Sequence, residues 1–170
     1  MVTTGYHGTS AAEADAILST RVFKKSASSK EWLGEGIYFY DEYIDAYKWA
    51  KDRYGANGAV LHVIIEVDDD EYLDLLDKRT AVYLAEAIDV LEEAGQFTND
   101  PEKNICTLAN FLWQVPLESK EVKLLLCGFY KEKKKVPLLI DVRDLRHEMC
   151  VRDNEYIKSI QKVEAGDQSV

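Results

Sequence analysis

Strand-forming runs recur along the whole chain without a regular alternation with helices, and this pattern restricts the fold more than any other feature of the sequence. The two strongest runs, residues 59–67 and 122–130, are rich in Val, Ile and Leu, and residues 136–142, 148–152 and 157–163 are expected to be further strands. A doubly wound parallel sheet needs a helix between successive strands. Because the helical patterns lie in the first two thirds of the chain, the sequence predicts an α+β fold.

Four helices are expected from their end signals and from apolar residues at helical spacing. Each begins after a residue whose side chain can bond a free backbone N–H, or ends at a glycine. The expected boundaries are Ser10 with Glu13 as a capping box for the first helix, Asp41 to Tyr54 and Gly55 for the second, residues 84–94 with Gly95 for the third, and Asp100 with Pro101 at the start of the fourth.

The composition fits one folded domain over residues 1–170. Hydrophobic residues make up 46% of the chain, which is typical of a globular protein and not of a disordered one. Lys and Arg number 21 against 31 Asp and Glu, so the formal net charge is -10. Since a broad nucleic-acid surface works by neutralising phosphates, this acidity argues against one, but it leaves room for a small local contact.

No apolar run is long enough to cross a bilayer, and the N-terminus lacks the charged and apolar regions of a signal peptide, so a cytoplasmic protein is expected. The three scattered cysteines, Cys106, Cys127 and Cys150, lack the spacing of a redox motif and are expected to be buried thiols. The three histidines show no metal-ligand spacing with the cysteines or with one another. The sequence therefore predicts no metal site.

Three short segments carry residues suited to chemistry: residues 7–9 (His-Gly-Thr), residues 34–39 (Gly-Glu-Gly-Ile-Tyr-Phe) and Glu148 with the Met-Cys-Val that follows it. Each has an ordinary explanation when taken alone: a histidine in a turn or a core, aromatic residues of a strand, and a charge at a sheet edge. Their order and spacing, from the first strand to a strand near the C-terminus, favour a joint role.

In this order the segments resemble the diphtheria-toxin-like ADP-ribosyltransferases, and specifically the His-Tyr-Glu branch that includes the catalytic domains of poly(ADP-ribose) polymerases. The resemblance extends from residue 6 to residue 153 and implies split antiparallel β-sheets with flanking helices. It also implies NAD as the substrate and no metal. The residues that it assigns are His7, Tyr38 and Glu148 as catalytic, and His7, Gly8, Thr9, Gly36, Tyr38 and Trp49 as binding NAD.

These residue types suit the cleavage of the bond between nicotinamide and ribose, which passes through an oxocarbenium-like state. The carboxylate of Glu148 would stabilise the positive charge that develops at the anomeric carbon and orient or deprotonate the acceptor. A neutral His7 would hydrogen-bond a ribose hydroxyl, and Gly8 would let the backbone approach the nicotinamide amide. Tyr38 and Trp49 would stack on the two faces of the nicotinamide ring.

One position departs from the family pattern. The polymerases usually carry a serine three residues before the second stacking aromatic, where it bonds the nicotinamide amide, but this chain has Ala46 three residues before Trp49. Either weaker nicotinamide binding or a shifted helix register is therefore expected.

The resemblance implies mono-ADP-ribosyl transfer to a macromolecular acceptor. Small single-domain relatives are often toxins or anti-phage defence effectors, and such toxins commonly have an antitoxin partner. Two lysine-rich segments, residues 24–30 and 131–135, slightly favour a nucleic acid, RNA included, over a protein as the acceptor. Two alternatives stay open: an NAD glycohydrolase of the same fold, and a module that binds a partner without catalysis.

Overall fold

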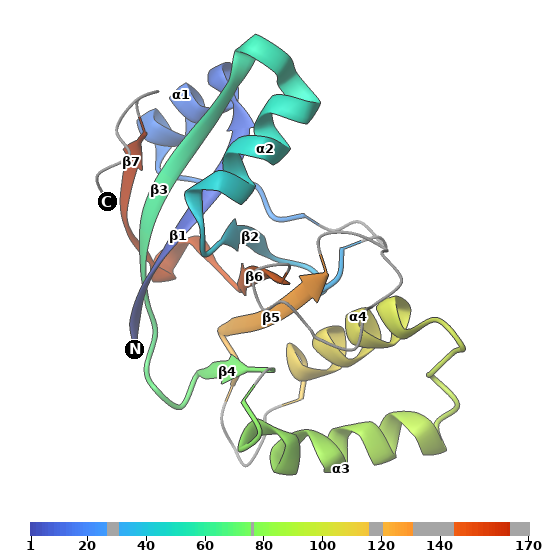
Figure 1. Cartoon of the computed structure of the whole chain (residues 1–170). Coiled ribbons are helices and arrows are strands. Elements are labelled where there is room, and N and C mark those ends of the chain that lie inside the picture. Colours follow the sequence, from blue (N-terminus) through green and yellow to red (C-terminus); the bar gives the residue numbers. More distant parts are fainter. Residues whose placement is uncertain (27–30, 76, 116–120, 131–144, 164–170) are drawn as a thin grey trace.

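A computed structural model describes residues 1–26, 31–75, 77–115, 121–130 and 145–163. Within them lie four α-helices and one seven-stranded sheet in the order β4-β5-β6-β2-β1-β3-β7 (Figure 1). The helices are α1 (Ala11–Thr20), α2 (Tyr43–Tyr54), α3 (Thr80–Glu93) and α4 (Pro101–Leu112). The strands are β1 (Val2–Ser10), β2 (Ile37–Tyr40), β3 (Gly58–Glu66), β4 (Tyr72–Asp74), β5 (Leu124–Tyr130), β6 (Leu145–Val151) and β7 (Ile157–Lys162).

The predicted α+β class is confirmed. Neighbouring strands are antiparallel except β4 and β5, which are parallel. All four expected helices form, and α3 and α4 lie beside the β4–β5 part of the sheet, away from α1 and α2 (Figure 1). The strand expected at residues 136–142 and the lysines at 131–135 lie outside the described residues.

The sheet is continuous, in contrast to the two separate sheets expected. Its two halves meet where β1 pairs with β2, and the register there is the single pair Tyr6↔Tyr40. By comparison, β1 pairs with β3 along its whole length from Val2 to Ser10. Continuing the β1–β2 register would pair Gly8 with Tyr38, but the strands have parted by then. The sheet is therefore nearly divided at the point where the first two sequence motifs lie.

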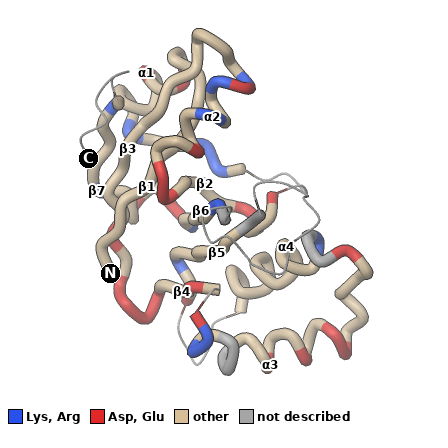
Figure 2. Tube along the Cα trace, in the orientation of Figure 1, with Lys and Arg blue, Asp and Glu red and all other residues tan. Residues whose placement is uncertain are grey.

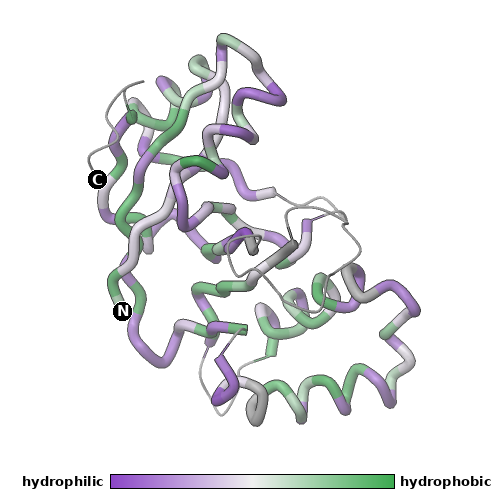
Figure 3. The backbone as a smooth tube through the Cα atoms, in the orientation of Figure 1, coloured by the Kyte–Doolittle hydropathy of each residue, from purple (hydrophilic) through white to green (hydrophobic). Residues whose placement is uncertain are grey.

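The two faces of the sheet are covered differently. Residues of α1 pack on one face with Phe39 of β2 and with Met149 and Val151 of β6. The opposite face carries Cys150, which packs against a cluster formed largely by α3 and α4. Figure 3 shows hydrophobic positions along β3 and on one side of both α3 and α4. Because side chains of a strand alternate between faces, Glu148 shares the α3–α4 face with Cys150.

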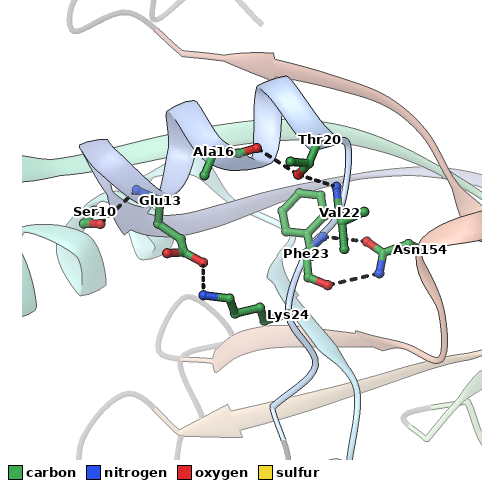
Figure 4. A network of polar contacts seen from close by, with 8 residues as sticks. All are labelled: Ser10, Glu13, Ala16, Thr20, Val22, Phe23, Lys24 and Asn154. Carbon is green, nitrogen blue, oxygen red and sulfur yellow. Dashed lines mark hydrogen bonds and ion pairs between the residues drawn. The ribbon is translucent and has the colours of Figure 1, made fainter.

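Two expected helix caps differ in the structure. Ser10 does cap α1 by accepting a hydrogen bond from the backbone N–H of Glu13 at 3.2 Å, but the Glu13 carboxylate contacts Lys24 at 3.1 Å (Figure 4). The expectation that Asp41 caps α2 is wrong: Glu42 occupies the N-cap without a side-chain bond. The Asp41 carboxylate instead contacts the ring of His147 at 2.7 Å, so a partner distant in sequence has displaced the local one.

The segment that leaves α1 is held in place by hydrogen bonds to the far end of the chain. Phe23 bonds the side-chain amide of Asn154 through both its backbone groups, at 2.7 Å and 3.0 Å, while the hydroxyl of Thr20 closes the last turn of α1 (Figure 4). This contact holds Phe23 in the core, where its ring lies against the ring of His7. Lys24 is the next residue along the chain.

The cysteines fit the sequence expectation in part. Cys127 and Cys150 are buried, but Cys106 in α4 is only partly buried. Burial raises the pKa of the Cys127 thiol to about 11 and raises that of Cys150 as well, so both remain thiols at neutral pH. Among the described residues, no helix combines the length and apolar character that crossing a membrane requires.

Candidate active site

A cavity of about 340 Å³ lies where β1 and β2 separate, and it brings the three sequence motifs together. Its lining also includes side chains from α2 and from the segments that flank β2. Thr9 is the exception among the seven predicted site residues, because it is buried and does not line the cavity. The predicted residues that do line it are His7, Gly8, Gly36, Tyr38, Trp49 and Glu148.

His7 replaces a missing backbone contact between the two strands. Its Nδ1 lies 2.9 Å from the carbonyl oxygen of Tyr38, and since a carbonyl only accepts, Nδ1 carries the proton. Burial lowers the pKa of His7 and outweighs the opposing effect of this hydrogen bond. The ring is therefore neutral, and its Nε2 is left as a hydrogen-bond acceptor, suited to a hydroxyl group.

The Tyr38 side chain serves its own loop as well as the cavity. Its hydroxyl donates to the carbonyl of Gly34 at 2.6 Å and accepts from the N–H of Leu33 at 2.9 Å. Gly34 has a φ of +74°, which a residue with a Cβ rarely adopts. Burial raises the pKa of Tyr38, so the phenol stays neutral. The ring is thus fixed at the cavity by the turn that precedes β2.

Helix α4 and the residue that follows it support the same turn from the other side. The indole N–H of Trp113 donates to the carbonyl of Leu33 at 2.9 Å, and the side-chain oxygen of Asn110 accepts from the N–H of Glu35 at 3.3 Å. A Cβ on Gly36 would lie 2.3 Å from the sulfur of Cys150, so only glycine fits there. Gly36 therefore acts through the close approach of β2 to β6 as well as by lining the cavity.

Glu148 occupies the least ordinary position of the three motifs. It lies opposite Tyr40 of β2 and Cys127 of β5, in the middle of β6, so its description as a charge at a sheet edge is wrong. Its side chain is buried, with 7% of the residue exposed. A carboxylate in a central strand is unfavourable unless a partner or a function requires it.

The groups around Glu148 have opposing effects on the pKa of its carboxyl. Burial raises the pKa of its carboxyl, and Glu31 and Asp45 raise it further, while the guanidinium of Arg146 lowers it. Arg146 Nη2 contacts Glu148 Oε1 at 2.7 Å. The pKa of Glu148 is raised on balance, so its environment favours the neutral acid more than water does.

Trp49 and Gly8 bring α2 to the cavity. A Cβ on Gly8 would lie 2.3 Å from the carbonyl oxygen of Ala46, so β1 and α2 touch backbone to backbone. The same Cβ would lie 3.3 Å from the Trp49 ring. That ring is 36% exposed, and the guanidinium carbon of Arg53 lies 5.3 Å from its centroid. Ala46, which stands where the family usually has a serine, is fully buried.

Sequence reasoning missed several residues of the cavity. Arg146 and Tyr40 could have been found, since each lies two residues from a predicted residue and so shares its strand face. Lys24 belongs to one of the two lysine-rich segments that slightly favour a nucleic-acid acceptor. Glu31 carries no signal in the sequence. The further lining residues are Lys24, Ser26, Glu31, Trp32, Phe39, Tyr40 and Arg146.

No family model matches this chain. An alignment over 76 residues with an uncharacterized protein of Methanocaldococcus jannaschii is 32% identical, and it covers 41% of this chain and 36% of the archaeal protein. The chain thus spans about a third of the length of the relative that it matches. Within the part of the chain that the structure describes, no group of three or more His, Cys, Asp or Glu is placed to hold a metal ion.

Proposed function

We propose that this protein is an NAD-dependent mono-ADP-ribosyltransferase with an ADP-ribosyltransferase-type fold. The observation that carries the proposal is the carboxylate of Glu148, buried in a central strand and facing a cavity that also holds a neutral His7 and the ring of Tyr38. A cavity of about 340 Å³ is at the lower end of the size of small-molecule sites, which suits the nicotinamide riboside end of NAD.

In the proposed reaction the bond between the nicotinamide nitrogen and the ribose carbon breaks, and its electron pair leaves with nicotinamide. The Glu148 carboxylate stabilises the positive charge left on the ribose. The lone pair of the acceptor then forms the new bond to that carbon, and the acceptor's proton passes to Glu148 or to water. His7 Nε2 accepts from a ribose hydroxyl, and the rings of Tyr38 and Trp49 hold the nicotinamide.

We propose a macromolecular acceptor, with nucleic acid, RNA included, slightly favoured over protein. The support is Lys24 at the cavity, whose side chain is 83% exposed. A role as a cytoplasmic toxin or anti-phage defence effector, held in check by an antitoxin, is proposed with it by analogy alone.

The test is incubation of the purified protein with NAD labelled in its adenylate phosphate, together with separate pools of RNA, DNA and protein. We expect label in one pool and equimolar release of nicotinamide. Glu148→Gln should reduce both at least 100-fold, while Glu66→Gln, which removes an exposed carboxylate at the end of β3, should leave both unchanged.

Three outcomes would contradict the proposal in different ways. Nicotinamide release without label in any pool identifies an NAD glycohydrolase. Failure of the wild-type protein to consume NAD with any pool favours a cavity that binds a partner without catalysis. Full activity of Glu148→Gln means that Glu148 is not the catalytic carboxylate.

A further inference from the structure

We propose that Arg146 is a positioning residue that holds the carboxylate of Glu148 in its reactive orientation, an inference that rests on the proposed function. The two residues lie two positions apart on β6, so their side chains project from the same face of the sheet. Both line the cavity, and the Nη2–Oε1 distance of 2.7 Å is that of a strong charge-assisted hydrogen bond.

Arg146 is itself held in place by Tyr40. The guanidinium carbon lies 5.4 Å from the centroid of the Tyr40 ring, and Tyr40 is the residue that pairs with Glu148 across β2 and β6. A guanidinium over the face of a ring is attracted to it, which restricts the directions that its N–H groups can take. Tyr40, Arg146 and Glu148 therefore form a chain of contacts on the wall of the cavity.

A contribution to stability does not account for this pair. The Glu148 side chain is buried and that of Arg146 is 28% exposed. An ion pair with a buried member gains little net free energy, because the desolvation of its charges offsets their attraction. In addition, the buried Nε of Arg146 has no hydrogen-bond partner among the residues that the structure describes. An ion pair that leaves a buried donor unsatisfied suits a site that requires the carboxylate, and not one selected for packing.

The acidic groups around Glu148 make a cation beside its carboxylate favourable. The titratable groups that face it are Arg146 on its own strand, Tyr40 on β2, Cys127 on β5, Asp45 on α2 and Glu31 before β2. Glu31 and Asp45 both raise the pKa of Glu148, and Arg146 lowers it. Lys24 also lines the cavity, but its ammonium is largely exposed and pairs with Glu13. Without Arg146, Glu148 would face two like charges in a buried position.

The test compares Arg146→Gln and Arg146→Lys with Arg152→Gln as the matched control. Arg152 comes directly after β6, and its guanidinium carbon lies 5.6 Å from the centroid of the Trp113 ring, whereas Glu148 pairs with Arg146. We expect Arg146→Gln to lower kcat about 10- to 100-fold at neutral pH with little change in the KM for NAD. The acidic limb of the kcat–pH profile of Arg146→Gln should move to higher pH, because the pKa of Glu148 rises when Arg146 is removed. In Arg146→Lys the acidic limb should stay close to its wild-type position, since the positive charge remains.

A second readout separates this inference from the proposed function. The titration of the Glu148 carboxyl carbon is followed by NMR in protein labelled with carbon-13 at glutamate, and the signal is assigned by its loss in Glu148→Gln. If the pKa of Glu148 rises in Arg146→Gln but wild-type protein transfers no ADP-ribose, the proposed function fails and the pairing stands. If the titration and the pH limb are the same in Arg146→Gln and Arg152→Gln, the positioning role is wrong. Should Arg146→Gln not fold, Arg146→Lys with a changed kcat and an unchanged titration supports orientation by the planar guanidinium, and an unchanged kcat overturns it.

Discussion

At the scale of single residues, the carboxylate of Glu148 costs the protein stability. Its folded pKa is raised above the ordinary value, mainly by burial, so the folded chain binds the proton more tightly than the unfolded chain does. The protein is therefore most stable, as far as this group is concerned, when the pH is below the unfolded pKa. That stability is lost as the pH rises through the folded pKa.

Glu148→Gln should consequently be more stable than the wild type at neutral pH. The neutral amide avoids the desolvation of a charge and can still accept a hydrogen bond from Arg146, so we expect a gain of about 0.5–2 kcal/mol, which is the range of common stabilising substitutions. Urea unfolding at pH 7.5 measures the gain, and the difference should shrink at pH 4. A loss of stability at pH 7.5 would mean that the attraction of Arg146 outweighs the burial of the charge.

His7 imposes the opposite dependence on pH. Burial lowers its folded pKa below the value of about 6.5 for the unfolded chain, so its contribution to stability is complete above that value. This contribution is lost as the pH falls below 6.5 towards the folded pKa. His7→Gln keeps a donor for the Tyr38 carbonyl but does not titrate. We expect the wild type to lose more stability than His7→Gln between pH 7.5 and 5.5, measured by urea unfolding. Equal losses would show that the ring can take up a proton where it is.

At the scale of elements, the turn before β2 depends on the hydroxyl of Tyr38. Tyr38→Phe removes an acceptor from Leu33 N–H and a donor from Gly34 C=O, and each lost partner of a buried backbone group costs about 1–3 kcal/mol. We expect reduced stability in thermal or urea unfolding. Because the ring remains, the KM for NAD should change less than it does in Tyr38→Leu. If the two variants bind NAD equally, the ring does not stack on nicotinamide.

Local signals were enough to predict most elements. The β-branched run of β3, the Ser10 cap, the glycine at the end of α2 and the Pro101 start of α4 each depend on neighbours in sequence. Asp41 shows where this reasoning ends, because its carboxylate has an alternative partner 106 residues away. A local rule cannot weigh a cap against a contact that the tertiary fold creates.

The site residues also divide into those that local sequence signals predict and those that only the tertiary fold brings together. His7, Tyr38 and Glu148 belong to segments with recognisable order, and the structure gathers them at one cavity. The continuous sheet could not be predicted, because it depends on the single β1–β2 pair Tyr6↔Tyr40. Glu31 acts on Glu148 through space alone, and no spacing in the sequence encodes that proximity.

At the scale of the whole molecule, a net charge of -10 opposes the approach of any polyanion. Acidic positions lie in the turn between β3 and β4 and along α3, whereas the described cations lie singly or in small groups (Figure 2). At physiological ionic strength exposed charges more than about 8 Å apart are largely screened. A nucleic-acid acceptor would therefore be guided by the few cations at the cavity, and a basic protein acceptor by the overall acidity.

Reversal of the charge of Lys24 distinguishes these two acceptors. Lys24 lines the cavity, so Lys24→Glu removes a contact with an acceptor phosphate and should lower transfer to RNA roughly three- to tenfold, with a salt slope shallower by about 1. Lys158→Glu makes the same change in net charge on β7, at a residue that does not line the cavity, and serves as the control. Transfer is measured at 50 and 200 mM salt with labelled NAD. If RNA is labelled by neither the wild type nor Lys24→Glu, and Lys24→Glu raises transfer to a basic protein, the acceptor is protein, since the added negative charge then attracts it. If Lys24→Glu and Lys158→Glu behave alike, only the overall charge guides the acceptor.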